Sequence, residues 1–186
     1  MVTEARLVAQ ALAGSESAFE QIVRRYQRPV IGLIARITGD RSLAEDLAQD
    51  AFLKAYRNLA AFDTTRRLSS WLFRIAHNTA IDSLRRARPR TVSLEAPASA
   101  PDEGPLDPPA PAAPDPVERE ALGQALEQAM AALRTEYRAA ITLRYEEGLS
   151  FDQIAHVMSI PEATARSHVH RARKELAAVL RAEGWA

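Results

Sequence analysis

Proline is concentrated in one segment of this chain, and that segment divides the sequence into two parts. Eight of the 11 prolines fall between Pro97 and Pro116, among residues that are nearly all Ala, Asp, Glu, Gly and Ser. Such a stretch offers too little apolar surface to offset the entropy lost on ordering. Clustered proline also favours extended geometry. We therefore expect a flexible linker at 91–117, between one domain at 1–90 and another at 118–186.

The formal net charge is zero, but the charges are segregated along the chain. Residues 1–90 carry a net charge of +6, residues 91–120 carry −6, and residues 121–186 are neutral. Within the last part, residues 166–181 hold five Lys or Arg and one Glu. The sequence therefore predicts two basic surfaces suited to a polyanion, with an acidic segment between them.

Several classes of protein are disfavoured by composition. Cysteine is absent, which excludes disulfides and thiolate zinc sites and agrees with a reducing cytosol. No apolar run approaches the roughly 20 residues that span a bilayer. The segment Met1–Leu12 carries Glu4 and Arg6 and lacks a secretory pattern. We expect a mature chain that begins near Met1 and stays in the cytoplasm.

The first part predicts helices throughout. Patterns typical of capping boxes at 17–20 and 42–45 predict two helix starts, the second helix running to about Leu59. Pro29 is expected to interrupt or kink the first helix. A third helix should run from Trp71 to about Arg88, capped by Ser69 or Ser70. No segment alternates with period two, so we expect an all-α fold.

The second part contains a helix-turn-helix pattern. One helix is expected at 118–133, and a second from a capping Thr135 to near Gly148. A capping box at 150–153 then opens a short helix. A turn at 159–161 follows, and Pro161 opens the last, basic helix, which runs from 162 to 181. In a major groove, the basic helix would offer Thr164, Arg166, Ser167 and His170 to base edges, and Arg171, Arg173 and Lys174 to bases or phosphates. The alternative is a solvated basic helix on an ordinary bundle.

Short motifs in both parts resemble those of one family. They are Ala18–Glu20 with Arg25–Tyr26, Ala44–Phe52, Trp71–Asn78 continuing to Asp82 and Arg85–Arg86, Leu149–Ala155, and His170–Arg173. The order and spacing of these motifs make the chain outside the linker resemble the sigma-70 family, and within it the extracytoplasmic-function (ECF) group. The resemblance implies a sigma domain 2 bundle and a sigma domain 4 helix-turn-helix. It also implies a sigma factor that directs RNA polymerase core to specific promoters, in a stress or envelope response.

The resemblance implies that domain 2 binds the clamp helices of the polymerase large subunit. The contact positions match Asp46, Gln49, Asp50 and Phe52. Carboxylates such as Glu45, Asp46 and Asp50 are also favoured near a helix N-terminus. A plain acidic helix start would explain those carboxylates, but not Gln49 and Phe52.

DNA contacts are implied in both parts. Residues matching the −10 reading and melting elements are Phe62, Arg66, Arg67, Leu68, Trp71, Arg74, Asn78, Arg85 and Arg86. They supply platforms and cations for unstacked bases and phosphates, although Trp71 is as well suited to the core, and Leu72 and Ile75 are expected there. Residues matching −35 contacts are Arg166, Ser167, His170 and Arg171, with Arg144 reaching the backbone.

Some positions depart from the family pattern. The loop after Phe62 usually contains a glycine and a second aromatic residue, but reads Asp63–Leu68 here. Ser159 and Ala163 stand where glycine is usual, and His168 where a basic residue is usual. Base preference at both elements therefore cannot be transferred from the family.

Three other functions compete with this interpretation. A LuxR-type regulator would explain residues 164–169 but not 17–88. An enzyme or metal protein is disfavoured because His168 and His170 face different ways on a helix, and His77 and His156 lack partners at ligand spacing. No phosphate loop, nucleophile elbow or HExxH is present. We expect no catalytic residue, metal, cofactor or small-molecule substrate.

The third alternative is a pure interaction protein. The resemblance implies an anti-sigma factor as partner, which would hold the protein at the inner membrane if it is itself membrane-bound. The free chain is expected to be a monomer. The acidic linker, if it mimics nucleic acid in a basic polymerase channel, would assist initiation or promoter escape.

Overall fold

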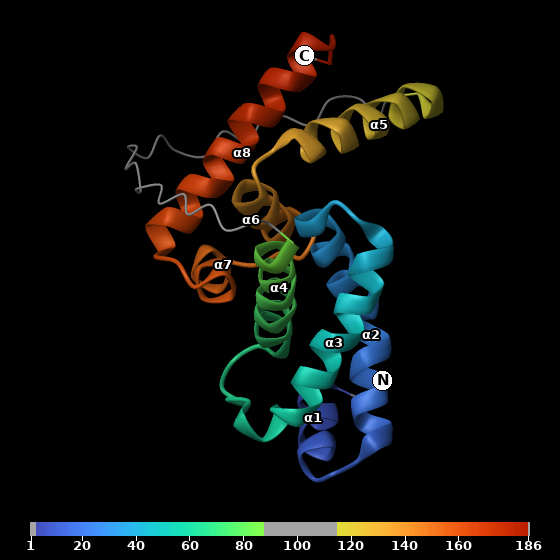
Figure 1. The fold of residues 1–186 in the computed structure, drawn as a ribbon, viewed down its shortest axis with the longest axis vertical. Helices are drawn as coiled ribbons and strands as arrows, with labels where there is room; N and C mark the ends of the chain where they lie inside the picture. The colour runs from blue at the N-terminus through green and yellow to red at the C-terminus, as the bar shows by residue number, and fades with distance from the viewer. Residues whose placement is uncertain (1–2, 88–114, 186) are drawn as a thin grey trace.

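The computed structural model describes residues 3–87 and 115–185 (Figure 1). Within these two ranges every regular element is helical, which confirms the expected all-α class. The expected linker at 91–117 lies almost wholly outside the described residues. Its last two residues begin a helix, since α5 (Pro116–Ala132) starts two residues earlier than the sequence suggested.

The first part is a bundle built around one long central helix. Its elements are α1 (Glu4–Leu12), α2 (Glu16–Thr38), α3 (Arg41–Arg57), the 3₁₀ turn η1 (Leu59–Ala61) and α4 (Leu68–Ala87). α2 packs against α1, α3 and α4. Ile22, Leu33 and Phe73 are almost completely buried between them. α1, which was not predicted, buries Leu7, Val8 and Ala11 at helical spacing.

Two predicted capping boxes are wrong because a better cap precedes each. α2 is capped by Ser15, whose Oγ accepts from the Ala18 N–H at 3.3 Å. α3 is capped by Asp40, whose Oδ1 accepts from the Leu43 N–H at 3.0 Å. The turn before α3 is formed by Gly39, which has a φ of +73° and ends α2. Each helix thus begins two residues earlier than expected.

Pro29 does not interrupt α2, so of the two expected effects, an interruption or a kink, the interruption is wrong. The helix continues to Thr38 although Pro29 contributes no backbone N–H. Tyr26, Val30 and Leu33 are buried on both sides of it, so tertiary packing supports the helix across the missing bond. The third predicted helix also begins earlier, at Leu68 rather than Trp71.

The second part is a smaller bundle. After α5 come α6 (Thr135–Tyr145), α7 (Phe151–Met158) and α8 (Glu162–Ala182). The capping box of α7 is confirmed, because Ser150 Oγ accepts from the Gln153 backbone and Gln153 accepts from the Ser150 N–H. Thr135 is not the cap of α6, whose N-cap position is Arg134. Pro161 occupies the N-cap position of α8 rather than its first helical position.

The two parts pack directly against each other. α6 lies against α2, and α7 lies against α4 (Figure 1). One cluster of buried side chains runs through both parts, containing Leu33 and Ile34 of α2 together with Ala140, Leu143 and Ile154. A second, smaller cluster joins α5, α6 and α8. The two sequence-defined parts therefore share a core in this structure.

Candidate protein and nucleic-acid interfaces

α3 presents an exposed face that is both acidic and apolar. Asp46, Gln49 and Asp50 are exposed along it, as predicted for a docking helix. Leu53 and Tyr56 continue the same face, with 52% and 47% of their surfaces exposed. We call these five residues the docking face. Such exposure of large apolar side chains beside carboxylates suits a protein partner.

Two expectations about this helix need correction. Phe52 is not on the docking face, because its side chain is buried in the core. The carboxylates are also not at the helix N-terminus, since the first turn from Arg41 holds no acidic residue and the dipole effect fades beyond that turn. The sequence signal for Leu53 was available: it falls off the buried four-residue stripe of Leu47, Ala51 and Ala55.

The segment from Phe62 to the end of α4 divides into buried and exposed side chains. Phe62 and Leu68 are buried, and Trp71 is half-buried with its ring centroid 5.2 Å from that of Phe62. These three support the bundle. Leu72 is also in the core, while Ile75 is partly buried against it. The exposed members of the predicted −10 set are all polar or cationic: Arg66, Arg67, Arg74, Asn78, Arg85 and Arg86.

α4 aligns three of those side chains. Arg74, Asn78 and Arg85 are separated by four and seven residues, which places them on one side of the helix. The preceding loop is shaped by Asp63, whose Oδ1 accepts from the backbone and hydroxyl of Thr65 at 3.0 and 2.6 Å. Those hydrogen bonds, and then the nearby Arg66, lower the pKa of the Asp63 carboxyl.

The helix-turn-helix is fixed by a tight turn and by an aromatic ring. Ser159 ends α7 with a φ of +57°, a conformation for which glycine is the usual residue. The guanidinium carbons of Arg144 and Arg166 lie 4.8 and 4.5 Å from the centroid of the Phe151 ring. Arg144 also donates to the Leu149 carbonyl at 2.8 Å. The ring therefore positions two predicted DNA-contacting arginines on adjacent helices.

α8 carries a basic face along its first four turns. Arg166, His170 and Lys174 are exposed at four-residue steps, and Arg173 lies half-buried beside them. We call these four residues the recognition face. Arg166 also pairs with Glu162 at 2.8 Å. This arrangement gives a DNA groove several donors at helical spacing.

The other residues of α8 that were predicted to contact DNA are turned more toward the protein than the recognition face is. Thr164 and Ser167 are half-buried. Arg171 donates to the Tyr137 hydroxyl at 3.2 Å. His168 packs its ring 5.3 Å from that of Tyr137, and burial lowers its pKa. The structure thus separates Arg171 from the recognition face.

No helix among the described residues has the length and apolar character required to span a membrane. Likewise, residues 3–87 and 115–185 contain no grouping of His, Asp or Glu side chains that could hold a metal ion.

Comparison with known proteins identifies the family. The sigma-70 region 2 model matches residues 22–90, and the sigma-70 region 4 model matches residues 123–176. The ECF RNA polymerase sigma factor SigW of Bacillus subtilis is 33% identical, over 94% of this chain and 95% of its own length. This chain belongs to the ECF group of the sigma-70 family.

Further relatives of this sigma factor agree with its assignment to the family. The RNA polymerase sigma-H factor of Pseudomonas aeruginosa is 36% identical, over 92% of this chain and 90% of its own. Among solved structures, the sigma factor RpoE in complex with the anti-sigma factor NepR from Bartonella quintana has a TM-score of 0.64 at 25% identity, covering 88% and 96% of the two chains.

The family also decides between the alternatives. A sigma factor is a non-catalytic factor of promoter-specific transcription initiation, which confirms the predicted function in outline. A LuxR-type regulator is excluded because the relatives match both parts of the chain. Residue roles within the two interfaces do not follow from the family match alone.

Proposed function

We propose that this sigma factor binds the clamp helices of the polymerase large subunit through the docking face of α3. The observation that carries this proposal is the exposure of Leu53 and Tyr56 next to Asp46, Gln49 and Asp50. Apolar side chains supply the contact area, and carboxylates select a basic partner. Phe52 would act indirectly, by holding α3 against the core.

Promoter contacts are assigned to two separate surfaces. Arg74, Asn78 and Arg85 of α4, with Arg66 and Arg67 of the loop and Arg86, would bind the unstacked −10 strand. The recognition face of α8 would enter the major groove at −35, with Arg144 on the backbone. Burial supports assigning Phe62 and Leu68 to the framework beneath the −10 surface, together with Trp71.

The remaining partners are proposed by analogy and chemistry. The related RpoE forms a complex with an anti-sigma factor, and we extend such a partner to this chain. We further propose that it works in the cytoplasm, has no catalytic activity of its own, and is a monomer when free. The domain limits at 1–90 and 118–186, and a role for the acidic linker between them, belong to the same proposal.

Run-off transcription with purified core polymerase on genomic fragments tests the function directly. The wild-type protein should add defined start sites that core alone lacks. Asp50→Arg should reduce core binding and transcription by about tenfold or more, because a carboxylate facing a basic partner becomes a repelling cation. The matched control is Glu20→Arg, which reverses an exposed carboxylate on α2. Absence of any added start site with wild-type protein would refute the proposed function.

A further inference from the structure

α2 carries exposed arginines that none of the proposed interfaces uses. Arg25 and Arg28 are both exposed, and Gly32 follows Arg28 by one turn. Spacings of three and four residues place these positions on one side of the helix. Within residues 3–87 and 115–185, no ion pair links Arg25 or Arg28 to a carboxylate. Like charges one turn apart slightly destabilise a helix, so helix stability does not explain this pair of cations.

Two carboxylates near this side of α2 are engaged by other groups. Glu20 pairs with Arg24 at 2.6 Å, within the same helix. Glu4 of α1 accepts a hydrogen bond from the Tyr26 hydroxyl. The side of α2 that holds Arg25 and Arg28 is therefore positively charged.

The N-terminal end of this basic side adjoins the proposed −10 surface. The ring of Tyr26, next to Arg25, packs against that of Phe73 in α4, with centroids 6.5 Å apart. Burial and then the Glu4 carboxylate raise the pKa of the Tyr26 hydroxyl, whereas the charges of Arg25 and Arg67 lower it. Cations from α2 and from the loop before α4 thus lie near one hydroxyl and belong to one continuous basic surface.

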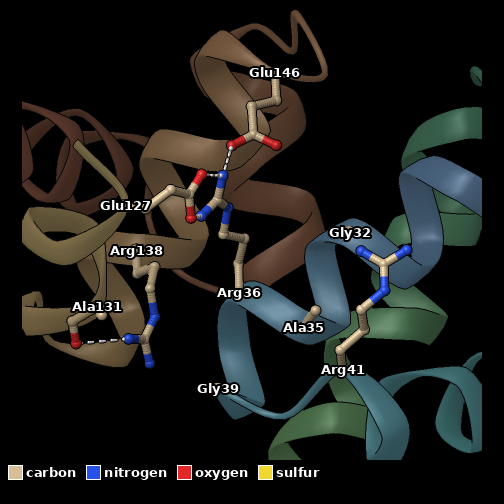
Figure 2. A pocket seen from close by; sticks show the side chains of 9 residues that line it. All are labelled: Gly32, Ala35, Arg36, Gly39, Arg41, Glu127, Ala131, Arg138 and Glu146. Atoms are coloured by element: carbon tan, nitrogen blue, oxygen red, sulfur yellow. Dashed lines mark hydrogen bonds and ion pairs between the residues drawn. The ribbon is translucent and has the colours of Figure 1, made fainter. Parts of the chain in front are cut away.

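The other end of this basic side reaches a cleft of about 510 Å³ between α2, α5 and α6 (Figure 2). Gly32 lines the cleft, and no heavy atom lies within 4 Å of the point where a Cβ on it would stand. Arg36 is not available there, because its guanidinium is held by Glu127 and Glu146. The open part of the cleft is therefore the part next to Gly32.

Arg41, at the start of α3, adds a third cation at that end. It lines the same cleft and points away from the carboxylates that hold Arg36 (Figure 2). Its side chain is 83% exposed and reaches Glu45 only at 3.9 Å. We call Arg25, Arg28 and Arg41 the α2 track. A row of exposed cations is typical of surfaces that follow a nucleic-acid backbone, since arginine binds phosphate oxygens with two parallel hydrogen bonds.

We propose that the α2 track binds the phosphates of the single promoter strand where that strand continues beyond the −10 surface. The inference rests on the proposed function of α4 and of the loop before it, from which the strand would pass to Arg25 and then to Arg28. The ligand is a nucleic-acid strand rather than an acidic protein, because the track is continuous with the surface that would already hold the strand. Phosphate contacts of this kind add affinity without base preference.

The length of the bound strand gives the test. Fluorescence anisotropy with the full-length protein would compare labelled single strands from a promoter found by start-site mapping. One strand covers the −10 segment alone, and two others extend it by about five nucleotides, each on one side. Wild-type protein should bind one of the extended strands about three- to tenfold more tightly than the short strand.

Arg25→Ala combined with Arg28→Ala should remove most of that gain and leave binding of the short strand unchanged. The slope of log affinity against log salt concentration for the extended strand should become shallower by about 1.4, or about 0.7 for each lost phosphate contact. Both positions are exposed, and alanine is the best helix former, so circular dichroism should show a folded protein. Should the variant not fold, glutamine at both positions removes the same charges.

Two further variants control for charge. Lys174→Ala combined with Arg181→Ala removes two exposed cations from α8 and should keep the gain. Arg25→Lys combined with Arg28→Lys should keep it as well, because lysine also binds phosphate, as a point charge.

The outcomes separate this inference from the proposed function. If neither extension strengthens binding by wild-type protein, or if the track variant loses affinity equally for short and extended strands, the α2 track does not hold the continuing strand. Failure of wild-type protein to bind the short strand would instead count against the proposed −10 function of α4.

Discussion

At the scale of single residues, Arg166 shows how a side chain that we propose to read DNA is positioned within the protein alone. Its guanidinium lies over the Phe151 ring and pairs with Glu162. A side chain held in this way loses less rotamer freedom on binding. Arg171, by contrast, is directed to the Tyr137 hydroxyl, so its replacement would disturb the packing of the bundle.

Arg166→Ala should therefore weaken binding of a −35 duplex by about 1–3 kcal/mol, with relaxed preference at one base pair, as for an arginine that contacts a base edge. Arg181→Ala is the matched control, because Arg181 is exposed near the end of the same helix and its side chain donates to the Ala177 carbonyl of that helix. Fluorescence anisotropy on a promoter found by start-site mapping gives both affinities. Equal losses for the two variants would indicate a general charge effect rather than base reading.

At the scale of elements, α3 has two candidate N-caps, Asp40 and Ser42, and the structure selects Asp40. Asp40 accepts from the Leu43 N–H, whereas Ser42 lies inside the first turn. Asp40→Ala should cost about 1 kcal/mol of unfolding free energy, the usual loss for an N-cap. Ser42→Ala should change it by a few tenths at most, because alanine is the better helix former. Urea denaturation measures both, and a larger loss for Ser42→Ala would contradict the assignment.

These caps also show what local patterns can and cannot predict. A Ser followed by Glu three residues later is a capping signal, and Ser17 and Ser42 both carry it. The helices nevertheless start two residues earlier, because Ser15 and Asp40 cap them instead. Before Ser150 stand Gly148 and Leu149, which offer no capping side chain, and the predicted capping box is confirmed. Periodicity predicted every α-helix of the described residues except α1, whose apolar pattern of Leu7, Val8 and Ala11 is short. Helix limits depended on contacts that a single pattern does not encode.

The sequence predicted which helices form the proposed interfaces, but not in every case which of their side chains are exposed. Motif matching located α3, α4 and α8, and periodicity then indicates which side of each is exposed. It did not reveal that Phe52, Phe62 and Leu68 are buried, because burial depends on which neighbouring helix covers them. His156 was even less accessible to sequence reasoning, since its contacts with Arg66 and Arg74 span more than 80 residues.

At the scale of the whole molecule, one buried and two half-buried histidines should make stability depend on pH. Burial is the largest cause of the lowered pKa of His77, His156 and His168. Around His77, Glu136 opposes the shift and Arg85 adds to it. Around His156, Arg66 and Arg74 add to it and Asp152 opposes it. The folded state therefore holds these rings neutral, while the unfolded chain titrates near the ordinary value of about 6.5.

The sign of the effect follows from which state binds the proton. Well above pH 6.5 both states are neutral at these rings and the folded state keeps its full stability. As the pH falls below that value, the unfolded chain gains protons that the folded state resists, so the unfolding free energy should decrease between about pH 7.5 and 5.5. This range lies above that in which carboxylates ordinarily titrate. His77→Gln should show a shallower decrease, because His77 is the most buried of the three. Urea unfolding of both proteins at the two pH values tests this, and equal slopes would mean that His77 titrates alike in the folded and unfolded states.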